Sequence, residues 1–216
     1  MSIISARGAS LFLGSVPGAA KAISAISNAA NAVATLEASH GVTVGAYVYI
    51  RSGWPLLDRR IARASAVAGN DVTLEGIDTS DTGVYIPGSG LGTVQEFTWA
   101  TQLSQIEPSI NTSGGELKTQ DGTFLEHLID QVYPDGFNAS QWTVGYFSDA
   151  SLAWLAAVRA AQMSQRERPF MFKSLGNQRV IYSSFWSLNE FASIQNNSFR
   201  GQITLNHQGQ PTVYAT

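Results

Sequence analysis

Histidines, carboxylates and a glycine-rich loop are the residues of this chain that could take part in chemistry. His40, His127 and His207 lie far apart in the sequence, and none belongs to a paired spacing such as H-E-x-x-H that holds zinc. We expect each of them to be a surface or turn histidine. The absence of cysteine excludes thiolate metal sites, disulfides and cysteine nucleophiles. No metal and no cofactor is predicted.

The glycine-rich segment, residues 88–92 (GSGLG), superficially resembles a phosphate-binding loop. Such a loop must follow a strand and open a helix, whose N-terminal amides hold the anion. Here the glycines precede a predicted strand, and no Walker lysine follows. A G-x-S-x-G elbow and a compact carboxylate pair are also missing, which argues against a hydrolase or a glycosidase. We predict that the protein is not an enzyme.

The elements that would position these residues are mostly strands, because apolar and polar residues alternate along much of the chain. Strands are expected at residues 46–51, 58–67, 72–77, 93–106, 140–147, 170–173, 178–187 and 198–206. The sequence AGND at residues 68–71 predicts a hairpin turn, and turns are also expected at residues 176–177 and 207–210.

One helix is predicted over residues 152–163, with Ser148 and Asp149 as its N-terminal cap. Residues 116–133 fit either a helix alone or a strand that leads into a short helix. Residues 1–21 are rich in glycine, alanine and serine and fit either an extended arm or a frayed terminus. We divide the chain into an N-terminal arm, residues 1–21, and a single β-sandwich domain, residues 22–216.

The composition points to assembly with other subunits. Charged residues make up 13% of the chain, about half of the usual share, and a surface so poor in charge is typically covered by another subunit. The net charge is −3 with no run of lysine or arginine, so the chain is not built to grip nucleic acid, although a mildly acidic wall can enclose it. No segment predicts a signal peptide or a membrane anchor, so we expect assembly in the cytoplasm.

Four segments, in this order, resemble the major tail tube proteins of siphophages, the phages with long non-contractile tails. The first is residues 32–50, which end in GAYVYI, with Ala46 where an acidic residue is common in that family. The second is residues 72–79 (VTLEGIDT), and the third is Trp99 with the SGGE of residues 113–116. The fourth is strand, helix, strand and Gly176, followed by a last strand that ends in GQPTVY.

The resemblance implies a mainly β fold, a β-sandwich or barrel with one flanking α-helix and long assembly loops. Strands of six subunits would join into one ring-wide β-barrel, and stacked hexameric rings would form a tube that conducts genomic DNA into the host. The implied partners are other copies of the chain, tail proteins at the tip and terminator ends, and DNA that passes through the lumen non-specifically. The implied location is the virion tail. Six chains of charge −3 give a ring charge of −18 (6 × −3), which discourages phosphate adhesion.

Two sets of residues are candidates for roles in such a tube. Glu75 and Glu96 lie opposite apolar residues on predicted strands, so they either face the lumen or are exposed on the outside. Residues 78–92 and 107–115 predict long loops that contact neighbouring subunits or are mobile surface loops, and deleting either is expected to leave monomers in place of tubes. The intersubunit candidates in these loops are Asp78, Asp81, Gly88, Gly92, Glu107, Gly114 and Gly115.

Two other functions remain open at this stage. A neck, terminator or baseplate ring protein has a related β fold but forms one ring that does not stack. A carbohydrate-binding β-sandwich would stack sugars on Trp54, Trp142 or Trp186, and Trp54 is the strongest candidate because it precedes Pro55 in a predicted loop. Trp99 and Trp154 are predicted to be core residues.

Overall fold

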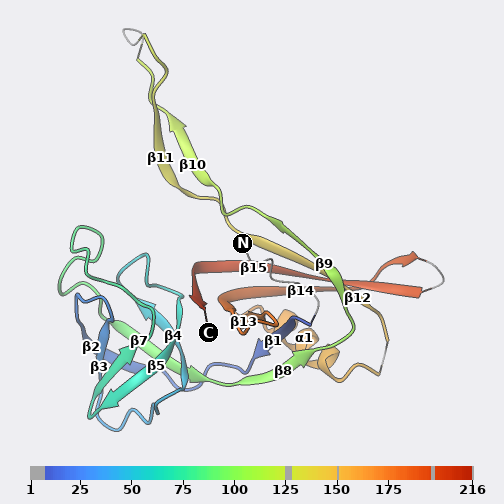
Figure 1. The fold of residues 1–216 in the computed structure, drawn as a ribbon, viewed down its shortest axis with the longest axis horizontal. Helices are drawn as coiled ribbons and strands as arrows, with labels where there is room; N and C mark the ends of the chain where they lie inside the picture. The colour runs from blue at the N-terminus through green and yellow to red at the C-terminus, as the bar shows by residue number, and fades with distance from the viewer. Residues whose placement is uncertain (1–7, 125–127, 150, 196–197, 216) are drawn as a thin grey trace.

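A computed structural model describes residues 8–124, 128–149, 151–195 and 198–215. The structure is mainly β, as predicted: among the described residues, 54% lie in strands and 6% lie in one helix. Its strands form a closed six-stranded barrel, a seven-stranded sheet and a two-stranded hairpin. Figure 1 shows the barrel at the left, the sheet with its helix at the right, and the hairpin projecting away from both.

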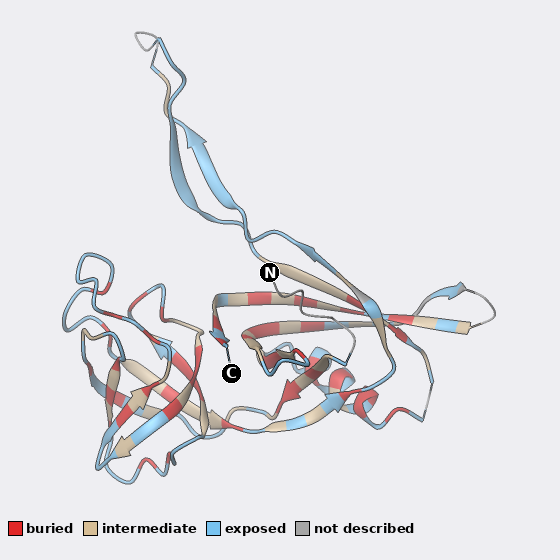
Figure 2. Ribbon diagram, in the orientation of Figure 1, coloured by how far each residue is buried: buried red, intermediate tan, exposed pale blue. Residues whose placement is uncertain are grey.

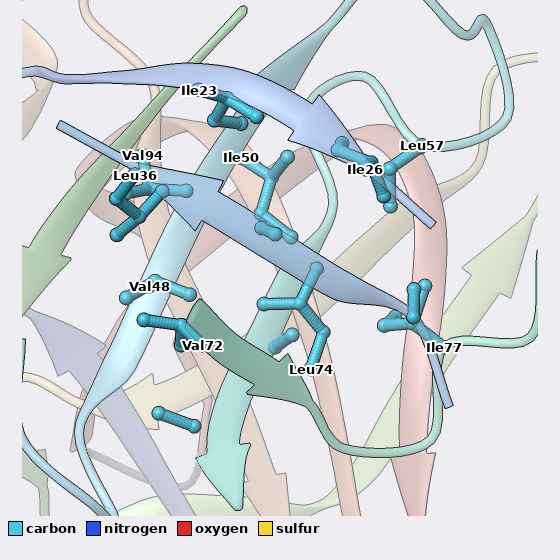
Figure 3. Close-up of a cluster of buried hydrophobic side chains, with 14 of the residues drawn as sticks. Ile23, Ile26, Leu36, Val48, Ile50, Leu57, Val72, Leu74, Ile77 and Val94 are labelled. Atoms are coloured by element: carbon cyan, nitrogen blue, oxygen red, sulfur yellow. The ribbon is translucent and has the colours of Figure 1, made fainter. Parts of the chain in front are cut away.

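The barrel contains strands β2 to β7, all antiparallel, in the order β2-β3-β6-β5-β4-β7. Its strands are β2 (Lys21–Ile26), β3 (Val33–Leu36), β4 (Tyr47–Ser52), β5 (Ile61–Ala68), β6 (Asp71–Leu74) and β7 (Gly92–Phe97). Alternate side chains, among them Leu36, Val48 and Leu74, point inward to one core (Figure 3). Because the barrel closes, it has no free strand edge.

The sheet has the order β8-β1-β13-β14-β15-β12-β9, again antiparallel throughout. Its strands are β8 (Trp99–Leu103), β1 (Ser10–Gly14), β13 (Arg168–Lys173), β14 (Arg179–Gln195), β15 (Ser198–Tyr214), β12 (Gln141–Phe147) and β9 (Ile106–Ser113). Helix α1 (Ala153–Ser164) packs against it, and its buried residues, Trp154, Leu155 and Val158 among them, share one core with Phe170 and Ile203. Strands β8 and β9 are the two free edges of this sheet.

The hairpin consists of β10 (Leu117–Asp121) and β11 (Val132–Phe137), which pair only with each other. Every residue of both strands is exposed, and the hairpin is pale blue along its strands in Figure 2, whereas buried residues in red alternate with tan or blue ones in the barrel and the sheet. The hairpin therefore has no core of its own.

Two segments cross side by side between the barrel and the sheet. One is the link from β1 to β2, and the other is Thr98, which alone separates β7 from β8. The Ser15 amide donates to the Thr98 carbonyl at 2.8 Å, and the Gly18 amide donates to the Glu96 carbonyl at 2.8 Å. A shared core cluster, which includes Ile61 from the barrel and Ile181 from the sheet, packs the two parts together.

Several predictions about the elements are wrong. Residues 10–14 of the predicted arm form β1, because Leu11 and Leu13 are buried between β8 and β13. The single strand predicted at residues 93–106 is divided at Thr98 into a barrel strand and a sheet strand. Residues 106–113 form the edge strand β9, where a loop over 107–115 was predicted, because they pair with β12.

Further differences concern the hairpin, a turn and the helix cap. Residues 117–121 and 132–137 are strands, so a helix over 116–133 is wrong for the described part of that range. Residues 207–210 lie within β15, at a bulge where Gly209 has a φ of 69° and the pairing with β14 shifts. Helix α1 is capped by Leu152 without a side-chain hydrogen bond, while the Asp149 carboxylate accepts the Ser151 amide at 2.9 Å.

Candidate assembly surfaces

The hairpin is a surface that lacks cover along the full length of both strands. It begins at Gly114 and Gly115, both with positive φ, which glycine adopts without steric cost. The Gly115 amide donates to the Asn138 carbonyl at 3.1 Å and closes the base. Large apolar side chains on the hairpin are more than half exposed: Leu117, Phe124, Leu128, Ile129, Val132, Tyr133 and Phe137. Clustered exposed apolar residues mark interaction surfaces.

The hairpin also holds the acidic excess of the whole chain. Residues 115–138 contain five acidic residues and one lysine, which gives −4 (1 − 5), so the other residues together have a charge of +1 (−3 + 4). Lys118 pairs with Asp135 at 2.6 Å. The acidic balance noted in the sequence is therefore a property of one projecting element rather than of the body of the protein.

The free edges of the sheet form a second surface. Strands β8 and β9 follow one another in sequence, and a cavity of about 720 Å³ lies between them, lined by Leu103, Ile106, Pro108 and Phe172 among others. Edge strands expose unpaired amides and carbonyls that can pair with another chain. Pro108 is compatible with this edge position because proline lacks a donor. Glu107 forms an ion pair with Arg200 on β15.

Residues 78–91 form a loop, where a loop over 78–92 was predicted, and side-chain hydrogen bonds join it to the barrel. The Asn28 side-chain amide donates to the carbonyls of Thr79 at 3.0 Å and Tyr85 at 2.8 Å. The Asp78 carboxylate accepts the Ser80 amide and hydroxyl, and these bonds hold its pKa below the usual value. Three apolar side chains of the loop are exposed: Val84, Ile86 and Leu91.

Other loop candidates have simple structural surroundings. The Asp81 carboxylate accepts the Gly83 amide at 2.9 Å, which ties the loop to itself. Gly88 has a φ of 81°, and nothing lies within 4 Å of the place where a side chain would begin. Gly92 is the first residue of β7 and pairs with Ser52 of β4. Whether these residues contact a neighbouring subunit stays a prediction.

The two acids predicted to face the lumen lie apart in the barrel. Glu75 follows β6 and forms two hydrogen bonds with Arg63, at 2.5 and 2.6 Å, and these bonds lower its pKa. Glu96 lies on β7, opposite Val48 of β4. Strands β6 and β7 are not neighbours in the barrel. Within the described residues, no cation pairs with Glu96, so its charge is the less compensated of the two.

The histidines were predicted to lie at the surface or in turns; His40 follows the turn at residues 38–39, whereas His207 lies in neither place. His40 is buried, and its Nδ1 accepts the Val42 amide at 3.0 Å. His207 is 4% exposed, hydrogen-bonds Ser184 at 2.7 Å and stacks on Tyr182, and burial lowers its pKa to about 4. His127 lies outside the described residues. No group of three or more potential metal ligands occurs in the part of the chain that the structure describes.

The prediction of Trp54 as a sugar platform is wrong. Its ring is 2% exposed, packs edge-on against Tyr85, and donates from Nε1 to the Ile86 carbonyl at 2.8 Å. Trp186 is buried as well, and Trp142 lies among Phe170, Tyr182 and other rings. These side chains fill cores and do not offer a flat exposed face.

Sequence reasoning missed two surfaces. The hairpin was obscured because residues 116–133 contain no clean alternation, although the paired glycines before it mark a sharp turn. The other is a groove between barrel and sheet, lined by Arg51, Arg166 and Arg168 among others. No local signal could have revealed it, because its walls come from distant parts of the chain.

A self-contained barrel, a sheet with two free edges and a projecting apolar hairpin are features typical of a structural protein that assembles with other subunits. Residues 52–216 match the family model of phage tail tube proteins, and the chain belongs to this family. The match begins after the first of the four segments that resemble tail tube proteins and includes the other three. No curated protein matches the chain.

Family membership implies a place in the virion tail, self-assembly and contact with other tail proteins. Tail tube proteins are structural and typically lack enzymatic activity. Of the helices in the described ranges, none has the length and apolar character needed to span a membrane.

Proposed function

We propose that the chain forms hexameric rings that stack into a tail tube, and that this tube conducts genomic DNA into the host. The observation that supports this most strongly is the hairpin β10–β11, which is exposed along its whole length. An isolated two-stranded hairpin is marginally stable in water. Covering its apolar side chains would contribute about 25 cal/mol for each Å² removed from water. Contact with a neighbouring subunit would therefore stabilise the hairpin and also contribute binding free energy to assembly.

The free edges β8 and β9 support the formation of rings. Each offers a row of backbone donors and acceptors that another subunit would satisfy by strand pairing. Repetition of that contact around a closed ring would join the sheets of six copies into one continuous barrel. Such a contact is heterologous, since it joins two different edges. A ring of these contacts closes only if the rotation from one subunit to the next is a whole-number fraction of 360°.

Passive conduction of DNA requires a wall without free cations. Five arginines are already paired with carboxylates: Arg51, Arg59, Arg63, Arg159 and Arg200. Paired arginines release fewer counterions from a phosphate chain and bind it more weakly. Glu75 and Glu96 remain the acids proposed to face the channel, and Glu96, which lacks a paired cation within the described residues, is the stronger candidate.

Electron microscopy of the purified, concentrated protein tests the proposal. We expect filaments of uniform width with a central channel. Replacing residues 117–137 by two glycines should leave a folded monomer, shown by an unchanged strand signal in circular dichroism, and should abolish the filaments. Single rings that never stack would favour the neck, terminator or baseplate function. Filaments that form normally without the hairpin would remove the main support for its role.

The loop of residues 78–92 needs a milder test than deletion, because deleting it would remove the carbonyls to which Asn28 and Trp54 donate hydrogen bonds. Changing the exposed Val84 and Ile86 to serine leaves the hydrogen bonds from Asn28 and Trp54 to the loop carbonyls intact, because these bonds are accepted by the backbone. Weaker filament formation at unchanged monomer stability is expected if the loop contacts a neighbour. Unchanged filaments would exclude a role for these two side chains.

A further inference from the structure

A groove lies where the barrel meets the sheet, and we name it the junction groove. It has a volume of about 470 Å³. The barrel contributes Tyr49, Arg51 and Gln95, the crossing segment contributes Val16 and Pro17, and the other wall is formed by residues 164–168 with Phe185.

The junction groove has an excess of positive charge. The carboxylate on its lining, Glu167, pairs with Arg59 at 2.8 Å and accepts the Tyr49 hydroxyl at 2.5 Å. Arg51 on the lining pairs at 3.0 Å with Asp58, which lies outside the groove. Two more cations, Arg166 and Arg168, have no carboxylate partner among the described residues. Three arginines of the lining against one carboxylate leave a charge of +2 (3 − 1).

Arg168 is the less satisfied of the two unpaired cations. One of its terminal nitrogens donates to the Gly14 carbonyl at 2.7 Å, whereas its Nε is buried without a hydrogen-bond partner in the described structure. Burial lowers its pKa, since no nearby carboxylate offsets the desolvation of the charge. A partly buried guanidinium in a groove favours an anionic partner.

The groove also offers apolar contact next to these cations. Val16 is 61% exposed although its side chain is apolar, and Pro17 and Phe185 lie on the same lining. A ligand that matches this lining combines negative charge with apolar side chains.

The end of the hairpin has this combination. Residues 119–134 contain Asp121, Glu126 and Asp130 and no lysine or arginine, a charge of −3. Leu128 and Ile129 in the same segment are 101% and 80% exposed. The hairpin projects away from its own barrel and sheet (Figure 1), and nine extended residues from its base span roughly 30 Å, so it is long enough to reach a second copy of the chain.

We propose that the acidic hairpin end of one subunit docks in the junction groove of a second copy, with Asp121 or Asp130 near Arg166 and Arg168 and the apolar side chains on Val16. This inference rests on the proposed tube, because it assigns one of its intersubunit contacts. Docking at the seam between barrel and sheet also fixes their relative orientation when a subunit joins the tube.

Charge reversal tests the electrostatic part. Arg166→Glu, and separately Asp121→Lys with Asp130→Lys, should each raise the critical concentration for tube formation roughly tenfold, the scale of a lost interfacial charge pair. Combining the two sets should restore much of the loss. The matched control is Lys173→Glu, which makes the same charge change on β13 outside the groove and should have little effect. Equal effects of Lys173→Glu and Arg166→Glu would overturn the proposal.

Cross-linking tests the geometry, and the absence of native cysteine makes the background clean. One batch of protein carries Asp130→Cys and another carries Val16→Cys, and the two are mixed before assembly and oxidised. We expect a disulfide-linked dimer that appears only in assembled samples. Val44→Cys, at a similarly exposed barrel position, replaces Val16→Cys in the control and should not cross-link.

The outcomes separate this inference from the proposed tube. Uniform tubes without a cross-link from Val16→Cys would overturn the docking site and leave the tube intact. A wild-type protein that forms no tubes would contradict the proposed function itself. A cross-link within one chain that carries both cysteines, at a dilution where only monomers exist, would show that the hairpin folds back on its own groove and would also overturn the proposal.

Discussion

The barrel and the hairpin are both built from short antiparallel strands, but they are stabilised in different ways. In the barrel, β3 and β6 bury every second residue, and ring closure satisfies both edges of each strand. In the hairpin, β10 and β11 bury none, while their apolar side chains lie in solvent. The barrel is therefore stabilised by a core within the chain, whereas the hairpin has only its own pairing and, in the proposed tube, would be stabilised by a partner.

The largest expected effect on the isolated subunit is in the barrel. Trp54→Ala removes a buried ring that contacts Tyr85 and lies within 2.9 Å of the site where Gly90 would bear a side chain. The loss of contacts and the resulting cavity should lower the free energy of unfolding by about 3–5 kcal/mol. Urea denaturation measures this, and Trp54→Phe should lose less. A loss below about 1 kcal/mol would contradict a rigid barrel core.

Acid should destabilise the sheet through His207. Its pKa is about 4 in the folded protein and about 6.5 in the unfolded chain, so between these values the unfolded chain binds more protons and stability rises with pH. The stabilising contribution of neutral His207 is complete above pH 6.5. The free energy of unfolding falls by about 3 kcal/mol as the pH falls to 4, at 1.36 kcal/mol for each pKa unit. His207→Phe should flatten the slope of unfolding free energy between pH 5 and 6.5, where carboxylates contribute little. An unchanged slope would exclude His207.

The contact between barrel and sheet should be weaker than either core. Glu167→Gln keeps the shape of a side chain that bonds Tyr49 at 2.5 Å, Ser183 at 3.0 Å and Arg59 at 2.8 Å. Loss of its charge should lower the free energy of unfolding by about 2 kcal/mol, because hydrogen bonds to charged groups are the stronger ones. Glu190→Gln, which breaks the more exposed ion pair with Arg159, is the control and should cost about 1 kcal/mol or less.

The smallest effect on the monomer is expected in the hairpin. Leu117→Ser changes an exposed side chain and should alter the free energy of unfolding by no more than about 0.5 kcal/mol. The same variant should weaken tube formation measurably in a sedimentation assay. A monomer strongly destabilised by this change would mean that the hairpin is part of the core of the subunit, and the contrast with the barrel would fail.

Sequence reasoning succeeded where local patterns decide the structure. The alternation in β4, the Gly69–Asn70 turn between β5 and β6, and the helix near residues 152–163 were all predictable, because each depends on neighbours in sequence. The tail tube family was also identified from the order of its segments.

The errors arose where the partner of a segment lies far away in sequence. Leu11 and Leu13 are buried only because β8 and β13 flank β1, and nothing in the first twenty residues indicates this. The alternation of apolar residues continues through Thr98, but the strand before it, β7, belongs to the barrel and the strand after it, β8, belongs to the sheet. The cations of the junction groove come from β4, from the segment after α1 and from the start of β13, so only the folded chain brings all of them together.

The paired crossing of Ser15–Gly18 and Glu96–Thr98 has a mechanical consequence. A force that pulls the barrel away from the sheet would be shared by two covalent segments. The hydrogen bonds between these segments would keep one from sliding along the other. Barrel and sheet would then move as one body when a long tail bends, and the strain would fall on the contacts between subunits. A tail that bends at the contacts between rigid subunits would follow from these two hydrogen-bonded crossing segments.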